Sequence, residues 1–176
     1  MSGVSNFSSV SGLLPNKSKS CCFFGNVPEN VCSEIVNTLG FQRGSLPINY
    51  LGLPLVTSKL SKSNCLPLVN RFSKKIENWT TKSLNFGGRL QLVNTVLGGM
   101  LSYWYFFLFL PQSTLQQLNS IMFKFLWGGY HKPTGRCHYK VNWIDCCTPK
   151  EEGGLGIKNL FVSNSSAIFY QLWRII

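Results

Sequence analysis

The stretch LNFGGRLQLVNTVLGGMLSYWYFFLFLP, from Leu84 to Pro111, decides between two architectures for this chain. Its only charged residue is Arg89, and the next charge along the chain is Lys124. The window Leu90–Leu110 is therefore long enough to cross a bilayer, which takes about 20 residues at a rise of about 1.5 Å each. The same window also suits a helix in the core of a globular domain.

Polar residues inside the window favour the packed helix. It contains hydroxyl and amide side chains and a pair of glycines: Gln91, Asn94, Thr95, Ser102, Gly98 and Gly99. Leu90, Val93 and Leu97 share one helical face, as in a helix that packs on one side only. We therefore expect a buried helix, and a small basic protein anchored in a membrane by Leu90–Leu110 is the alternative.

The preceding segment, Ser61 to Lys82, has a two-faced helical pattern. At 100° per residue its apolar side consists of Leu66, Val69, Phe72, Ile76 and Trp79, and its opposite side consists of Arg71, Lys74, Lys75 and Lys82, here called the basic stripe. Glu77 is the only acid nearby and lies off the stripe. Such a stripe is typical of a surface that faces phosphates, whereas an ordinary solvated face explains any single lysine.

Two more helices are expected towards the C-terminus. Pro111 ends the apolar stretch, Ser113 or Thr114 can cap the next helix, and Gly128-Gly129 ends it. A short strand around Tyr139 to Trp143 and a glycine-rich loop follow. A last helix is expected to begin between Ser163 and Ser165 and to bury Ile168, Leu172 and Ile175.

The first 58 residues have a different character. We expect a strand at Cys21–Phe24, and a short helix that starts near Pro28 and stops at Gly40. The next segment, RGSLPINYLGLPL, is punctuated by glycine and proline and must consist of extended pieces joined by tight turns. The expected fold is therefore mainly α (α+β), with a helical region following a short N-terminal β-hairpin segment.

The charge balance indicates a polyanionic partner. Seventeen Lys and Arg against six Asp and Glu give a net charge of +11. Nucleic acid and an anionic membrane surface both fit that charge. No small-molecule substrate is evident.

The residue inventory excludes several kinds of chemistry. The single aspartate is Asp145, whereas two-metal phosphoryl transfer needs carboxylates that converge on ions about 4 Å apart. The histidines, His131 and His138, have no obvious acid partner. We expect no metal site. A site made of Cys137, His138, Cys146 and Cys147 remains a weaker alternative, because it lacks the C-x-x-C spacing of a zinc knuckle.

The cysteines point to an intracellular protein. The chain contains seven cysteines, which is an odd number, and two pairs of them are adjacent in sequence. Adjacent cysteines have poor geometry for a disulfide framework. The first residues, MSGVSNFSSVSG, lack the basic and apolar regions of a secretory signal. We therefore expect reduced thiols, and no particular compartment is indicated.

Four blocks in one order cover nearly the whole chain from about residue 12: GLLPNKSKS, LGFQRGSLPINYLGLPL, WTTKSLNFGGRLQLV, and FLWGG with KVNWIDCCTPKEEGGLGIKNL. Together they resemble the C-terminal part of the reverse transcriptase encoded by plant LINE-type (non-LTR) retrotransposons. The resemblance implies three regions. Residues 1–58 would be a remnant of the palm with the primer-grip hairpin, 59–130 a thumb-like helical region, and 131–176 a post-thumb loop with a truncated C-terminal helix.

The resemblance also implies roles for individual residues. Tyr50, Leu51 and Gly52 would form the primer grip, whose backbone holds the primer's 3′ end. Lys19 would be the palm-motif lysine near the triphosphate. The basic stripe and Arg89 would contact an RNA/DNA template-primer duplex, although Gly87, Gly88 and Arg89 also suit a structural role at a helix start.

The catalytic aspartates of that family lie upstream of the blocks matched here. The resemblance therefore implies a fragment of an RNA-directed DNA polymerase that is inactive by itself, with residual template-primer binding. No cofactor is expected, because the parent enzyme would hold Mg²⁺ through residues that are absent. A non-functional translated relic and a cysteine/histidine metal-dependent module are further alternatives.

Overall fold

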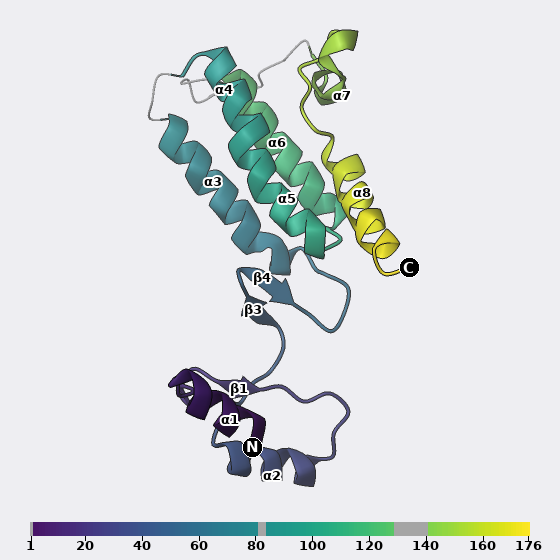
Figure 1. The fold of residues 1–176 in the computed structure, drawn as a ribbon. Coiled ribbons are helices and arrows are strands. Elements are labelled where there is room, and N and C mark those ends of the chain that lie inside the picture. Colours follow the sequence, from purple (N-terminus) through teal and green to yellow (C-terminus); the bar gives the residue numbers. More distant parts are fainter. Residues whose placement is uncertain (1, 81–83, 129–140) are drawn as a thin grey trace. The chain divides into compact units, whose positions relative to one another are not determined.

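The computed structural model describes residues 2–80, 84–128 and 141–176, and the chain divides into two compact units, Met1–Thr57 and Ser58–Ile176. The described chain is mainly α-helical and contains two small sheets of two strands each (Figure 1). The predicted fold class is confirmed.

The first unit contains two helices and both sheets. Helices α1 and α2 span Ser2–Ser11 and Glu29–Leu39, and strands β1 (Cys21–Cys22) and β2 (Gln42–Arg43) pair in parallel. The expected start and end of α2 are confirmed. Pro28 occupies the N-cap, and Gly40 adopts φ 67° at the C-cap, where its N–H donates to the Val36 carbonyl at 2.8 Å.

Helix α1 is not predicted by the sequence pattern. Val4, Phe7 and Val10 recur every three residues, but the residues between them are mostly serine and have modest helix propensity. Phe7 and Val10 are exposed, so burial does not stabilise the helix at these two positions. Serine hydroxyls support it locally, since Ser11 Oγ donates to the Phe7 carbonyl at 2.6 Å. Gly12, with φ 68°, follows its last residue.

The proline- and glycine-punctuated segment forms a hairpin, as expected. Strands β3 (Ile48–Tyr50) and β4 (Leu53–Leu55) are antiparallel, with Ile48 opposite Leu55 and Tyr50 opposite Leu53. The two-residue loop between them, Leu51-Gly52, has φ angles of 51° and 84°. Positive φ at both central residues is the mark of the tight turns that match strand twist.

The second unit is a set of packed helices. A 3₁₀ turn, Ser63–Cys65, leads into α3 (Leu66–Thr80). The other helices are α4 (Phe86–Leu92), a π-helical turn at Val93–Leu97, α5 (Gly98–Phe107), α6 (Gln112–Gly128), α7 (Trp143–Cys147) and α8 (Leu160–Trp173), with a 3₁₀ turn at Lys150–Glu152. Helix α6 contacts α3, α4 and α8, and α8 also packs along α5 (Figure 1).

The apolar core of this unit lies between these helices. Its most deeply buried side chains are Leu68, Phe72, Val93, Leu97, Leu101, Leu110, Leu118, Met122 and Leu126. Helix α3 packs against α6, and the rings of Trp79 and Phe125 lie 5.7 Å apart. Val69 and Phe72 are buried as predicted, but Leu66, at the first position of α3, is 47% exposed.

The stretch Leu90–Leu110 is a packed helical segment, as expected. Val93, Leu97 and Leu101 are at most 2% exposed, and the helix ends at Phe107 because Leu108 is extended (φ −134°, ψ 134°). In the ranges that the structure describes, every helix falls short of the length and apolar character needed to span a bilayer.

Two expected helix starts are wrong. The Pro111 carbonyl accepts from the N–H groups of Thr114 and Leu115, so α6 begins at Gln112 and neither Ser113 nor Thr114 caps it. Helix α8 begins at Leu160, because the Asn159 side chain accepts from the N–H groups of Phe161 and Val162.

Two other expectations for the C-terminal segment also differ from the structure. Tyr139 and Lys140, in the strand predicted around Tyr139 to Trp143, lie outside the described residues. The described part, from Val141 to Trp143, is not a strand, and helix α7 begins at Trp143. Leu172 and Ile175 are exposed rather than buried.

Helix α8 contacts α5 and α6, and its buried residues, Leu160 and Asn164, lie in its N-terminal half. Tyr170, further along α8, contacts Phe106 of α5 through its ring.

Candidate nucleic-acid interface

Three residues of the basic stripe lie together on the exposed face of α3. The helix buries Leu68 and Phe72, which turns Arg71, Lys74 and Lys75 outwards. These cations border a groove of about 340 Å³, which Asn78 and Met100 complete. Met100 belongs to α5, so the groove depends on the packing of two helices that are separated in sequence.

The electrostatics of this groove favour an anion. Among the described residues, none of the three cations forms an ion pair, and the ion pair that the structure does contain joins Arg43 to Glu29 in the first unit. That pair raises the pKa of Arg43 and lowers the pKa of Glu29 through hydrogen bonding and attraction. Cations without carboxylate partners keep their full charge available to a ligand.

The other two predicted members of the interface lie elsewhere. Lys82 falls outside the described residues. Arg89 is half-buried in α4 and does not line the groove, and its Nε is buried without a hydrogen-bond partner in the described chain. Beside it, Asn85 caps α4 by accepting from the Gly88 N–H at 2.7 Å.

The predicted primer-grip residues occupy the tip of the β3–β4 hairpin. Tyr50 is 60% exposed and Leu51 is 74% exposed, whereas Leu53 is buried. Gly52, with φ 84°, has a backbone conformation that disfavours any side chain. An exposed backbone turn of this kind can be approached closely by a ligand.

Lys19 lies at the end of a turn before β1. The Asn16 side chain accepts from the N–H groups of Ser18 and Lys19 at 3.0 and 3.2 Å, which fixes this turn. The Lys19 side chain is exposed. The backbone position of Lys19 is therefore defined, and its ammonium group is open to solvent.

The described residues do not form a metal centre. Within them, there is no group of three His, Cys, Asp or Glu residues placed to hold an ion. His131, Cys137 and His138 lie outside the described residues. Burial raises the pKa of the Cys146 thiol, and burial together with Cys146 raises the pKa of Cys147 to about 11. Thiols that stay protonated at neutral pH are weak nucleophiles and weak ligands.

Sequence reasoning missed two members of the groove. Asn78 lies four residues after Lys74 and three after Lys75, so helical spacing already places it beside the stripe. Met100 gives no such signal, because its position depends on how α5 packs.

A sequence similarity to a plant protein was found. No family model matches the chain. Over 124 residues the chain is 32% identical to a protein of Arabidopsis thaliana named "Putative ribonuclease H protein". The aligned stretch covers 70% of this chain but 20% of the Arabidopsis protein, so the chain spans about a fifth of the relative that it matches.

Proposed function

We propose that this chain binds the sugar-phosphate backbone of an RNA–DNA duplex, as part of a plant LINE-type reverse transcriptase that cannot polymerise by itself. The observation that supports this best is the exposed trio Arg71, Lys74 and Lys75 beside the α3–α5 groove, which forms no ion pair with any residue that the structure describes. Binding of this kind is independent of sequence and strongly dependent on salt.

The spacing of the stripe suits phosphates. Arg71 and Lys75 are separated by one helical turn, which is about 6 Å along the axis. Successive phosphates of one strand rise by about 3.4 Å along a duplex, so the trio spans about two of them. Asn78 also lines the groove, so the surface beside the three cations is polar.

The four sequence blocks that resemble the reverse transcriptase family also suggest roles for the rest of the chain. The hairpin tip Tyr50-Leu51-Gly52 would hold the primer's 3′ end, and Lys19 would lie near the triphosphate. In this proposal 1–58 is palm-derived, 59–130 is thumb-like and 131–176 follows the thumb. The sequence similarity to a protein with a ribonuclease name supports a nucleic-acid role.

The proposal does not include catalysis of polymerisation by this chain. The chain contains one aspartate, Asp145, and catalysis by two Mg²⁺ ions needs a converging set of carboxylates. We therefore propose binding without catalysis, and an inert translated relic is what the experiment below must exclude.

The test is fluorescence anisotropy with a labelled RNA–DNA hybrid between about 50 and 200 mM salt. The unmodified chain should bind, with affinity that falls steeply as salt rises. The double variant Lys74→Gln/Lys75→Gln should bind more weakly, and the slope of log affinity against log salt should become shallower by about 1 to 2.

The matched control is Lys124→Gln/Lys150→Gln, which removes the same charge from exposed lysines that do not line the groove. It should lose much less affinity. Equal losses in both double variants would mean that net charge alone drives binding, and absence of binding at low salt would leave the relic as the better explanation.

A further inference from the structure

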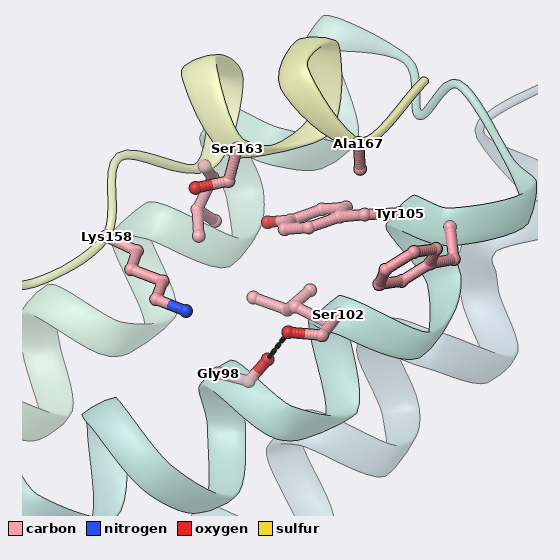
Figure 2. A pocket seen from close by; sticks show the side chains of 9 residues that line it. Gly98, Ser102, Tyr105, Lys158, Ser163 and Ala167 are labelled. Carbon is pink, nitrogen blue, oxygen red and sulfur yellow. Dashed lines mark hydrogen bonds between the residues drawn. The ribbon is translucent and has the colours of Figure 1, made fainter. Parts of the chain in front are cut away.

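A second pocket lies between α5 and the start of α8, away from the basic groove. Its volume is about 180 Å³. Residues of α5, of the loop before α8 and of α8 line it, and Figure 2 shows Tyr105, Lys158 and Ser163 around the same space. Neither the sequence blocks nor the proposed duplex binding accounts for this pocket.

The Tyr105 hydroxyl is the unusual group in this pocket. The residue is 5% exposed, and its hydroxyl has no hydrogen-bond partner in the described part of the protein. Burial raises the pKa of Tyr105, so the phenol remains a donor throughout the ordinary pH range. A buried donor without an acceptor is costly, and a ligand that brings an acceptor removes that cost.

Positive charge lies at the same pocket. Lys158 lines it and forms no ion pair among the described residues, and Figure 2 shows its ammonium group directed into the space in front of Tyr105. Helix α8 begins two residues later, and the dipole at a helix start also favours an anion. The polar end of the pocket therefore suits an anionic acceptor.

The remaining walls are mostly apolar. They are formed by Leu101, Phe106, Leu160 and Ala167, together with Gly98 and two serines, Ser102 and Ser163. The Ser102 hydroxyl is already engaged, because it donates to the Gly98 carbonyl at 2.9 Å. An apolar cavity of about 150 Å³ is large enough for benzene, so this pocket fits a body of about that size. An adjoining hollow of about 20 Å³ shares Gly98, Leu101 and Lys158, and has room for one water.

We propose that this pocket binds a small monocarboxylate with an apolar body about the size of a benzene ring. The carboxylate accepts hydrogen bonds from the Tyr105 hydroxyl and the Lys158 ammonium group, and the body packs on Leu101, Phe106 and Leu160. A single lysine matches one negative charge, which favours a carboxylate over a phosphate dianion.

The test uses 4-fluorobenzoate as the probe and follows its ¹⁹F NMR signal with the full chain. Tyr105→Phe and Lys158→Gln should each weaken binding about tenfold, because each removes one charge-assisted hydrogen bond. The neutral analogue 4-fluorobenzyl alcohol should bind about tenfold more weakly than the acid. Lys124→Gln is the matched control and should bind as the unmodified chain does.

Folding is checked separately from binding. Tyr105→Phe removes a hydroxyl that has no partner, so the melting temperature of the ligand-free variant should not fall. A marked fall would overturn the proposal, because it would mean that the hydroxyl is already satisfied by water. Absence of probe binding, or equal binding by acid and alcohol, would overturn it as well.

This inference is independent of the duplex proposal. Lys74→Gln/Lys75→Gln should leave probe binding unchanged, and Lys158→Gln should leave most duplex affinity intact. Either activity can therefore fail without the other.

Discussion

Asn164 is the residue on which the packing of α8 most directly depends. It is 1% exposed, its amide nitrogen donates to the Leu108 carbonyl at 2.9 Å, and its amide oxygen accepts from the Leu110 N–H at 3.0 Å. Leu108 and Leu110 belong to the link between α5 and α6. One side chain therefore satisfies two backbone groups of a segment more than 50 residues earlier.

Replacement of Asn164 should consequently be severe. We expect Asn164→Ala to lower the free energy of unfolding by about 2–4 kcal/mol, because it leaves a donor and an acceptor unpaired in a buried place. Urea denaturation of the full chain measures this change in the free energy of unfolding. Ser166→Ala, on the exposed part of the same helix, should cost at most about 0.5 kcal/mol. Similar losses for the two variants would show that the Asn164 bonds are not formed.

The raised pKa of Cys147 predicts how stability changes at alkaline pH. The folded chain holds this thiol neutral up to about pH 11, whereas the ordinary value is 9.0. The unfolded chain therefore releases the proton first, so the stabilisation is complete below about pH 9 and is lost as pH rises towards about 11.

Urea midpoints measured across that pH range test this expectation. Cys147→Ser should show a smaller loss of stability than the unmodified chain. Cys65, Cys146 and Tyr105, whose pKa values are also raised by burial, should contribute to the remainder. An identical decline in Cys147→Ser would remove Cys147 as a cause.

Residue periodicity predicted some of these features and not others. The exposed positions of Arg71, Lys74 and Lys75 follow from 100° per residue, because the opposite face carries apolar residues. The role of Asn164 could not be predicted. Its partners lie in a distant loop, and the same residue type is common in exposed turns.

At the scale of elements, the segment from α4 to α5 is the one whose sequence fitted either a membrane-spanning helix or a helix packed in a core. Of the predicted face, Val93 and Leu97 are buried and Leu90 is half-buried, and Leu101, which the prediction did not include, is buried as well. The π-helical turn at Val93–Leu97 was not predicted, because a single wide turn leaves no mark in an apolar pattern. Helix α7 was missed for a related reason, since five residues are too few to show a period.

Glycine positions in and after these helices give an element-scale prediction. Gly99 lies in α5, and a Cβ there would meet nothing within 4 Å. We expect Gly99→Ala to raise the free energy of unfolding by about 0.5–1 kcal/mol, because it reduces the entropy of the unfolded chain. Thermal or urea denaturation measures the gain.

Gly154, in the loop after α7, provides the opposite case. A Cβ there would lie 2.1 Å from the Thr148 carbonyl oxygen, a backbone atom that cannot easily move. Gly154→Ala should therefore destabilise the chain. A stabilising effect at Gly154, or a destabilising one at Gly99, would contradict the backbone described here.

At the scale of the whole molecule, the buried core is distributed unevenly. Among the described residues, the apolar core includes Cys32 and Leu53 from Met1–Thr57, and its other members belong to Ser58–Ile176. The second unit therefore provides the rigid framework for both the basic groove and the Tyr105 pocket. Composition and periodicity predicted a mainly helical chain, but neither could predict cavities that form where separate helices meet.

The central claim is that a nucleic-acid duplex occupies the groove between α3 and α5. The three methionines of the chain allow a direct measurement by methyl NMR with labelled methionine. Met100 lines the groove, whereas Met122 is 1% exposed in the core. Adding an RNA–DNA hybrid should shift or broaden the Met100 methyl signal, leave that of Met122 in place, and be reversed by salt. A Met100 signal that stays unchanged while anisotropy reports bound hybrid would contradict the account.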